Sequence, residues 1–289
     1  MAVWYCGSTK HAAVAQWAAA TVYAAGSIVR QLAAPAVGSE RCFRTALGGT
    51  SAGAEPAWVL TKAAAQPADN TIADWVEVTG NTAWGWLAAH ARLSAALAWL
   101  AAGDTLYVSH AHAETQAAAM TLTSPGAAAT TCLVLCVNDG ATPPTTLATT
   151  GTVTTTGNFS ISFLGFAYVY GLTFTAGSGA NATLINFTST TPWGYVFDSC
   201  SLVIGGTSTS TRFIVNGGSS GDDQLLRMVN TSIGFSAAST GGLTFGNVRI
   251  EWYDKESAVT GTSPATLLTP IANMPGQVVL AGLDLSTVT

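Results

Sequence analysis

Short apolar runs recur through the second half of the chain, and they constrain its fold more than any other feature. In order they include AYVYGLTF, GYVFDSCSL, LLRMVNTSIGF, LTFGNVRIEW and QVVLAGLDLS, separated by turns rich in Gly, Ser and Thr. Alternation of apolar and polar residues with a period of two is the pattern of a β-strand. Irregular repetition of one strand–turn–strand unit predicts a parallel β-solenoid, whose coils bury their apolar faces against one another. A β-sandwich with long loops is the alternative.

One helix is predicted just before these repeats. Residues 84–102 are rich in Ala and Leu, and Gly103 stands where a helix C-cap is expected. Four apolar residues in this segment fall at helical spacing: Leu93, Ala96, Leu97 and Leu100. No second helix is predicted from there to the end of the chain.

The first part of the chain has a different composition. Six of the nine tryptophans fall in the first 90 residues, and short strands are expected within residues 21–30, 41–47 and 74–78. The composition changes near Gly80. We therefore predict an all-β protein with two parts: residues 1–80 form a small Trp-cored β module, and residues 81–289 form a helix-capped parallel β-helix domain.

Charge is scarce and unevenly distributed. Charged residues make up 9% of the chain, the net charge is -5 and the pI is about 5.2. Nucleic-acid binding needs clustered Lys and Arg, so this class of partner is excluded from the prediction. Residues 140–197 carry no charge of either sign. We expect this segment to stack against itself or to be covered by neighbouring chains, and we interpret it as an assembly surface.

Compartment signals point to a soluble, unexported protein. The five cysteines are an odd number and sparse for the length, so reduced thiols are expected. The N-terminus has no basic region followed by an apolar one, and thus no signal peptide is predicted. The most apolar stretch, residues 87–102, is too short to span a bilayer, so no membrane partner is expected.

The first part resembles the small chitin-binding type of carbohydrate-binding module. The residues that carry this resemblance are Trp17, Tyr23, Gly26, Val29, Phe43 and Trp75, and Ser27 stands where the family commonly has an acidic residue. The resemblance implies carbohydrate binding, for which Trp58, Trp17 and Tyr23 are the candidates. Trp58, which follows Pro56, is the best single candidate for an exposed stacking residue, and the alternative is a place in the module's core.

Two further resemblances point to tailed bacteriophages. The stretch GTSAGAEPAW, residues 49–58, is similar to versions of this module in tailed-phage virion proteins. The second part resembles phage proteins with right-handed parallel β-helices, which open with a helix, a Gly-Asp-Thr step, a strand and a turn containing His and Glu. The matching residues are Gly103, Asp104, Thr105, Tyr107, His112 and Glu114. The resemblance implies a short right-handed solenoid.

Neither a metal site nor a cofactor is predicted. His110 and His112 are two residues apart, and Cys132 and Cys136 are four apart, which matches no usual zinc spacing. Polar turn histidines and apolar core thiols are the favoured interpretation. The chain has no Ser-His-Asp motif, phosphate loop or dinucleotide fingerprint.

Acidic residues offer a weak case for a glycoside hydrolase. Such an enzyme needs two carboxyl groups across a sugar. Asp222 and Asp223 are adjacent and would point to opposite faces of a strand, although Asp198 on a neighbouring coil could complete a pair. A solvated turn is the favoured interpretation. We therefore predict that the protein is not an enzyme.

These observations lead to one expected function and one alternative. We expect a non-enzymatic structural protein of a tailed-phage virion, assembled in the host cytoplasm as a homotrimer. The module begins almost at Met1 and the chain has no long shaft, which favours an outer capsid decoration (cement) protein that contacts the major capsid protein. The alternative is a tail fibre or tail spike component that binds, or depolymerises, host surface polysaccharide.

Overall fold

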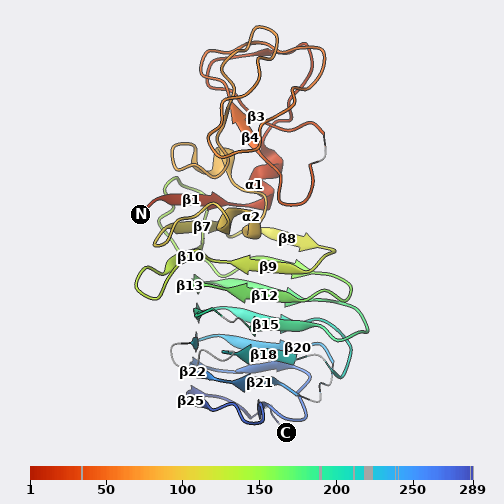
Figure 1. Ribbon diagram of the computed structural model, residues 1–289, viewed down its shortest axis with the longest axis vertical. Coiled ribbons are helices and arrows are strands. Elements are labelled where there is room, and N and C mark those ends of the chain that lie inside the picture. Colours follow the sequence, from red (N-terminus) through yellow and green to blue (C-terminus); the bar gives the residue numbers. More distant parts are fainter. Residues whose placement is uncertain are drawn as a thin grey trace.

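The computed structural model shows a small module at one end of a right-handed parallel β-solenoid of about six coils (Figure 1). It describes residues 1–33, 35–188, 191–210, 212–217, 224–237, 239, 241–286 and 288. The predicted fold class is confirmed: the chain is nearly all β, with two short helices and the solenoid in its C-terminal part.

Each of the six coils contributes one strand to each of three parallel sheets, and sheet 1 has one additional strand at each end. Sheet 1 contains, in spatial order, β1(Val3–Cys6), β7(Thr105–Ser109), β10(Cys132–Val137), β13(Phe166–Tyr170), β16(Gly194–Asp198), β19(Leu225–Val229), β22(Val248–Lys255) and β25(Gly276–Leu283). Sheet 2 contains β8(Ala113–Gln116), β11(Gly151–Thr155), β14(Leu172–Ala176), β17(Ser201–Ile204), β20(Ser232–Phe235) and β23(Val259–Gly261). Sheet 3 contains β9(Met120–Thr123), β12(Ile161–Leu164), β15(Leu184–Thr188), β18(Arg212–Asn216), β21(Leu243–Gly246) and β24(Leu268–Pro270).

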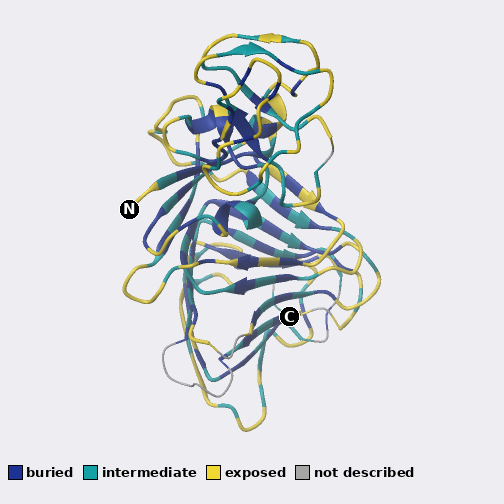
Figure 2. Ribbon diagram, turned by 45° about the horizontal axis from the view of Figure 1, so that its top comes forward, coloured by how far each residue is buried: buried dark blue, intermediate teal, exposed yellow. Residues whose placement is uncertain are grey.

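The core of the solenoid is built from columns of stacked apolar side chains. Inward residues occupy the same position on successive strands of sheet 1, because the strands pair in register. One such column runs through Trp4, Leu106, Val134, Val169, Phe197, Met228, Trp252 and Leu280. All its members are buried except the last, Leu280, which is 38% exposed. Figure 2 shows the resulting alternation of buried and intermediate residues along the strands, with exposed residues mainly in the loops.

A repeated backbone conformation marks the corner after sheet 1. The corner residues of five successive strands all have a positive φ, between 45° and 73°: Gly171, Ser199, Asn230, Asp254 and Gly282. This left-handed conformation suits Gly and Asn and is tolerated by Asp. It turns the chain within one residue, and the sheet-2 strands β14, β17 and β20 begin one or two residues after Gly171, Ser199 and Asn230.

The predicted helix is shorter than the sequence indicated. Residues 84–102 contain a 3₁₀ turn, η1(Gly85–Ala88), and the helix α2(Leu93–Leu97), with Ala89 in an extended conformation between them. Gly85 has a positive φ, which a continuous helix cannot accept. The four residues at helical spacing are all buried in the core against the first coil. Helix α2 therefore caps the solenoid.

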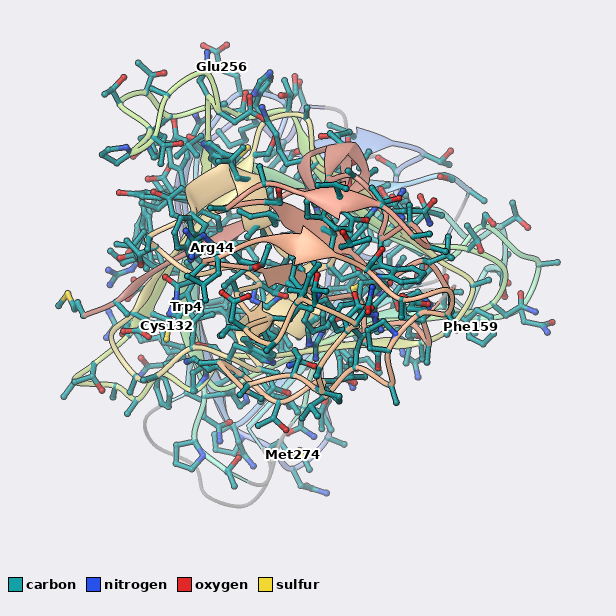
Figure 3. All side chains as sticks on the ribbon, turned by 90° about the horizontal axis from the view of Figure 1, so that it is seen from above. Trp4, Arg44, Cys132, Phe159, Glu256 and Met274 are labelled. Carbon is teal, nitrogen blue, oxygen red and sulfur yellow. The ribbon has the colours of Figure 1, made fainter. Side chains whose placement is uncertain are left out.

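The N-terminal strand belongs to the solenoid. We predicted a boundary near Gly80 with residues 1–80 in the module, whereas β1 pairs in parallel with β7 of sheet 1. The helix α1(Ser8–Ala13), which we did not predict, follows β1. The module proper is thus inserted between the first strand of sheet 1 and α2, and Figure 3 shows it from above, at the end of the solenoid.

Short strands build the module, as predicted, and they pair antiparallel. β2(Val22–Tyr23) pairs with β5(Gly49–Thr50), and β4(Cys42–Arg44) pairs with both β3(Ile28–Arg30) and β6(Val76–Glu77). Its apolar core consists of Trp17, Val29, Phe43, Ile72 and Trp75. All five cysteines of the chain are free and buried. Among the described residues, no helix has the length and hydropathy that a membrane span requires.

Candidate functional site

The three residues proposed for carbohydrate binding lie in one aromatic cluster of the module. Trp17 is only 1% exposed, and its Nε1 donates a hydrogen bond to Asp69 Oδ2 at 2.7 Å. Asp69 also accepts from Trp75 Nε1 at 3.1 Å and from the amide of Ala52 at 2.7 Å. Trp17 therefore supports the core of the module and offers no free ring face to a sugar.

Trp58 and Tyr23 are half-buried at the edge of this cluster. One face of the Trp58 ring stacks on Phe43, with centroids 4.0 Å apart and planes at 12°. Trp58 Nε1 donates to Glu55 Oε1 at 2.7 Å. Tyr23 packs edge-to-face against Trp75, and its hydroxyl oxygen accepts a hydrogen bond from the amide of Ala18 at 2.6 Å. Of the three candidates, Trp58 alone combines a partly exposed ring with an adjacent carboxylate, that of Glu55. Sugar binding at Trp58 stays a prediction.

The four residues weighed as metal ligands are dispersed. Cys132 and Cys136 lie in the solenoid core, and Cys132 Sγ donates to the carbonyl of Ala101 at 3.4 Å. His110 lies near the surface, 3.5 Å from Asp139. Within the described ranges, no three His, Cys, Asp or Glu side chains are grouped closely enough to hold a metal ion.

His112 belongs instead to a buried polar cluster between the module and the solenoid. Its Nδ1 accepts from the amide of Ser8 at 3.0 Å, so in the neutral ring the proton lies on Nε2, which is 3.3 Å from Glu114 Oε2. Glu114 Oε2 also accepts from the amide of Leu93 at 2.7 Å, at the start of α2. Burial alone would raise the pKa of Glu114, but these contacts hold that pKa below its ordinary value.

Arg92 extends this cluster into the module. Its Nε donates to Glu40 Oε1 at 2.5 Å, and its NH1 lies 3.9 Å from Glu114 Oε1. One guanidinium thus joins a carboxylate of the module to a carboxylate of the first coil. The amino-acid sequence does not reveal that these side chains meet, because residues 40, 92 and 114 follow no spacing that a motif would show. The cluster is suited to fixing the module on the solenoid.

The candidate hydrolase carboxylates are only partly within the described residues. Asp198 Oδ2 accepts from the Tyr168 hydroxyl at 2.7 Å, and Oδ1 accepts from Ser199 at 2.9 Å. Asp222 and Asp223 lie outside the described residues. A pairing of Asp198 with either of them is therefore an untested hypothesis.

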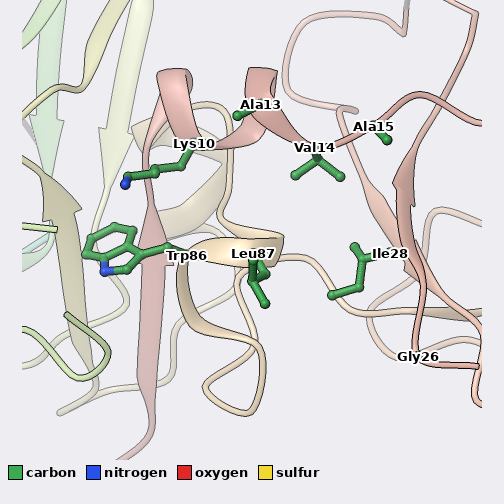
Figure 4. Close-up of a pocket in the computed structure, with 8 residues that line it drawn as sticks. All are labelled: Lys10, Ala13, Val14, Ala15, Gly26, Ile28, Trp86 and Leu87. Atoms are coloured by element: carbon green, nitrogen blue, oxygen red, sulfur yellow. The ribbon is translucent and has the colours of Figure 1, made fainter. Parts of the chain in front are cut away.

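An open groove of about 410 Å³ lies where the module meets the solenoid (Figure 4). Its apolar lining includes Val14, Ile28, Trp86 and Leu87, and the side chain of Leu87 is 68% exposed. Lys10 stands at one end and pairs with Asp139 at 3.2 Å. This lining offers apolar contact and one engaged cation, and it brings no nucleophile or carboxylate pair together.

The outer surfaces of the solenoid are the remaining candidate for function. The uncharged residues 140–197 span β11 to β15 and most of β16. On sheet 2, Thr152 and Thr154 pair in register with Thr173 and Thr175, so hydroxyl groups form a regular array on the outside. A structural role would use such walls for contact with other subunits.

Searches of protein-family models, of curated proteins and of solved structures found no match to this chain.

Proposed function

We propose that the protein is a non-enzymatic structural component of a tailed-phage virion, and within the virion an outer capsid decoration protein. The observation that carries this proposal is the uncharged segment 140–197 of the solenoid, whose strands surround part of a continuous apolar core. A rod of this kind gains its stability from stacking and presents flat surfaces for assembly. The resemblance of GTSAGAEPAW to phage virion modules supports the phage assignment.

The proposal includes its partners and its place. The chain would associate with itself as a homotrimer and with other virion proteins such as the major capsid protein, after assembly in the host cytoplasm. The proposed function includes no contact with nucleic acid or membrane, because the chain is acidic and its few basic residues are scattered along the sequence.

A tail fibre or tail spike component is the second candidate, favoured by one observation. Trp58 presents a partly exposed ring beside Glu55, which is an arrangement that can stack on a sugar and bond to its hydroxyl groups. In this case the partner is a host surface glycan, and a depolymerase activity would use Asp198, Asp222 or Asp223.

Immunogold labelling of the parent particle tests the proposal. An antibody raised against the recombinant protein should label the surface of the heads. Label confined to tails would favour the second candidate, and intact particles without label would contradict both.

An activity assay separates the structural role from the depolymerase. Purified protein incubated with host-envelope polysaccharide should release neither reducing sugar nor unsaturated uronide. Measurable turnover that is abolished in Asp198→Ala, Asp222→Ala or Asp223→Ala would overturn the non-enzymatic assignment.

A further inference from the structure

The three outer surfaces of the solenoid differ in their chemistry. Outward positions of sheet 2 carry mostly Thr and Ser. Those of sheet 3 mix polar residues, Thr121, Ser162, Asn186 and Thr244, with three aliphatic ones, Leu164, Leu184 and Ile214. Sheet 1 instead presents six half-buried apolar and aromatic residues, which we call the sheet-1 patch: Leu133, Phe166, Tyr168, Tyr170, Val196 and Leu225. The outer face of sheet 1 is therefore the apolar side of the rod.

The patch is continuous across four strands. Leu133 pairs in register with Tyr168, and Tyr168 with Val196. Phe166 and Leu225 lie on either side of Gly194, where an added Cβ would come within 2.9 Å of the Phe166 ring. The ring of Phe166 therefore covers Gly194 on the neighbouring strand.

The same face is covered within the chain on the coils nearer the module. There Trp86 packs edge-to-face on Tyr5, with centroids 4.9 Å apart, and contacts a cluster that includes Tyr107 and Leu135. Trp86 Nε1 is fixed by a hydrogen bond to the carbonyl of Ala141 at 2.9 Å. The sheet-1 patch continues this surface, yet its residues belong to none of the four hydrophobic clusters that the described residues form.

Charges of both signs border the patch and cancel. Asp198 lies on β16, while Arg227 and Arg249 both pair with Glu251 at 2.5 Å on the two strands that follow. A membrane or nucleic-acid surface would require an excess of basic groups, which this face lacks. This face carries equal numbers of positive and negative groups around an apolar centre. Two copies of it can therefore meet without net electrostatic repulsion. This charge balance favours self-association.

We propose that the sheet-1 patch is the surface through which copies of this chain associate, with sheet 1 of each copy turned toward the axis of the oligomer. The proposal rests on the proposed function and specifies which of the three walls makes the contact. Tyr168 and Tyr170 supply aromatic area of the kind enriched at protein interfaces. Sheets 2 and 3 then face outward.

One charge placed on each wall of a single coil tests the assignment. Val196 on β16, Val203 on β17 and Ile214 on β18 are outward, half-buried residues of sheets 1, 2 and 3. Sedimentation velocity and light scattering would compare Val196→Lys, Val203→Lys and Ile214→Lys with the unchanged protein. We expect Val196→Lys to weaken association at least about tenfold, because like charges would meet at the interface, and the other two to associate as the unchanged protein does.

Thermal unfolding of each variant shows whether it has folded. Cysteine cross-linking is a second measurement, and it does not depend on an added charge. Because all five native cysteines are buried, Val196→Cys and Val203→Cys each add one accessible thiol. A bismaleimide should cross-link copies of Val196→Cys and leave Val203→Cys uncross-linked. An unchanged protein that is monomeric at micromolar concentration, or dissociation by Val203→Lys or Ile214→Lys with Val196→Lys still assembled, would overturn the proposal. Neither outcome depends on whether antibody labels the particle.

Discussion

The module and the solenoid bury their interiors by different means. The solenoid uses strands of three to eight residues, whose backbones pair along the whole rod and whose apolar side chains stack in columns. The module has strands of only two or three residues, and buried carboxylates replace the missing backbone pairing. Asp69 accepts three hydrogen bonds, and Glu77 accepts from the amides of Ala63 and Thr79. In the module, these two buried acids thus supply contacts that longer strands would make through their backbones.

This difference predicts how damage spreads. In the solenoid each coil contacts its two neighbours, so the loss of one core side chain weakens a stack that extends in both directions. In the module each carboxylate holds a few defined groups, so its loss should be local. The following changes test that contrast, in order of decreasing effect.

Phe197→Ala should have the largest effect. Phe197 is fully buried at the centre of the rod and contacts the rings of Phe163, Phe174 and Tyr195. Its truncation leaves a cavity in the middle of a column, and we expect the free energy of unfolding to fall by about 3–5 kcal/mol. Denaturant unfolding monitored by far-UV circular dichroism measures it. Phe159→Ala, at a side chain that is 39% exposed, is the control and should change little; equal losses in the two variants would contradict the stacked-core account.

Asp69→Ala should cost about 3 kcal/mol, because it leaves two indole N–H groups and one amide buried without an acceptor. Hydrogen exchange should show lost protection in the module while the amides of the solenoid remain protected. Asp284→Ala, at an exposed carboxylate, is the matched control. Loss of protection spread evenly over the coils would show that the two parts do not respond separately.

Acid should loosen the junction of the two parts through His90. This side chain is fully buried beside Trp4 and Trp99, and burial, together with the positive charges of Arg41 and Lys62, lowers its pKa to about 3. The pKa in the unfolded chain is about 6.5, so the folded state binds fewer protons below that value. Lowering the pH by one unit within the range from about 6.5 to 3 should therefore lower the free energy of unfolding by at most about 1.4 kcal/mol.

Chemical unfolding at several pH values between 7 and 4 measures this dependence. His90→Leu removes this titrating group and should make the slope shallower, and His11, whose pKa burial also lowers, should account for part of the slope that remains. An identical slope in the unchanged protein and in His90→Leu would show that other groups cause the pH dependence.

Thr173→Lys should have the smallest effect on folding. Thr173 lies on the outer face of sheet 2, where its side chain is half-buried among other hydroxyl groups. A surface substitution of this kind typically changes the free energy of unfolding by no more than about 0.5 kcal/mol. A much larger loss in thermal unfolding would mean that the wall of sheet 2 is more tightly packed than its side chains indicate.

The repeats made the solenoid predictable, because alternation along the chain reports which side chains enter a column. The sequence did not reveal that β1 pairs with β7, since Val3 and Thr105 are joined by a contact that spans the whole module. It also did not reveal where α2 begins, because Ala and Leu favour a helix throughout residues 84–102, whereas Ala89 and Arg92 adopt extended conformations that separate α2 from η1. The corners at Ser199 and Asn230 fall inside runs that the sequence analysis treated as single units, and their common position appears only when the coils are aligned.

The candidate site was less predictable than the fold. The spacing of Trp17 and Trp58 could not distinguish a buried indole from a half-exposed one, because neither residue lies in a regular helix or strand. Contacts with Phe43 and Asp69 decide between the two environments. The apolar side of the rod was present in the alternation of AYVYG, where the tyrosines occupy the positions opposite the core residues. The sheet-1 patch becomes apparent only when the strands are aligned in register, as they are in the structure.

A difference map between parent particles and particles that lack this protein tests the central claim most directly. Cryo-electron microscopy of the two particles should show density for a short rod with a small module at one end, repeated on the outer surface of the capsid. If the two maps are identical over both head and tail, the protein is not a structural part of the virion.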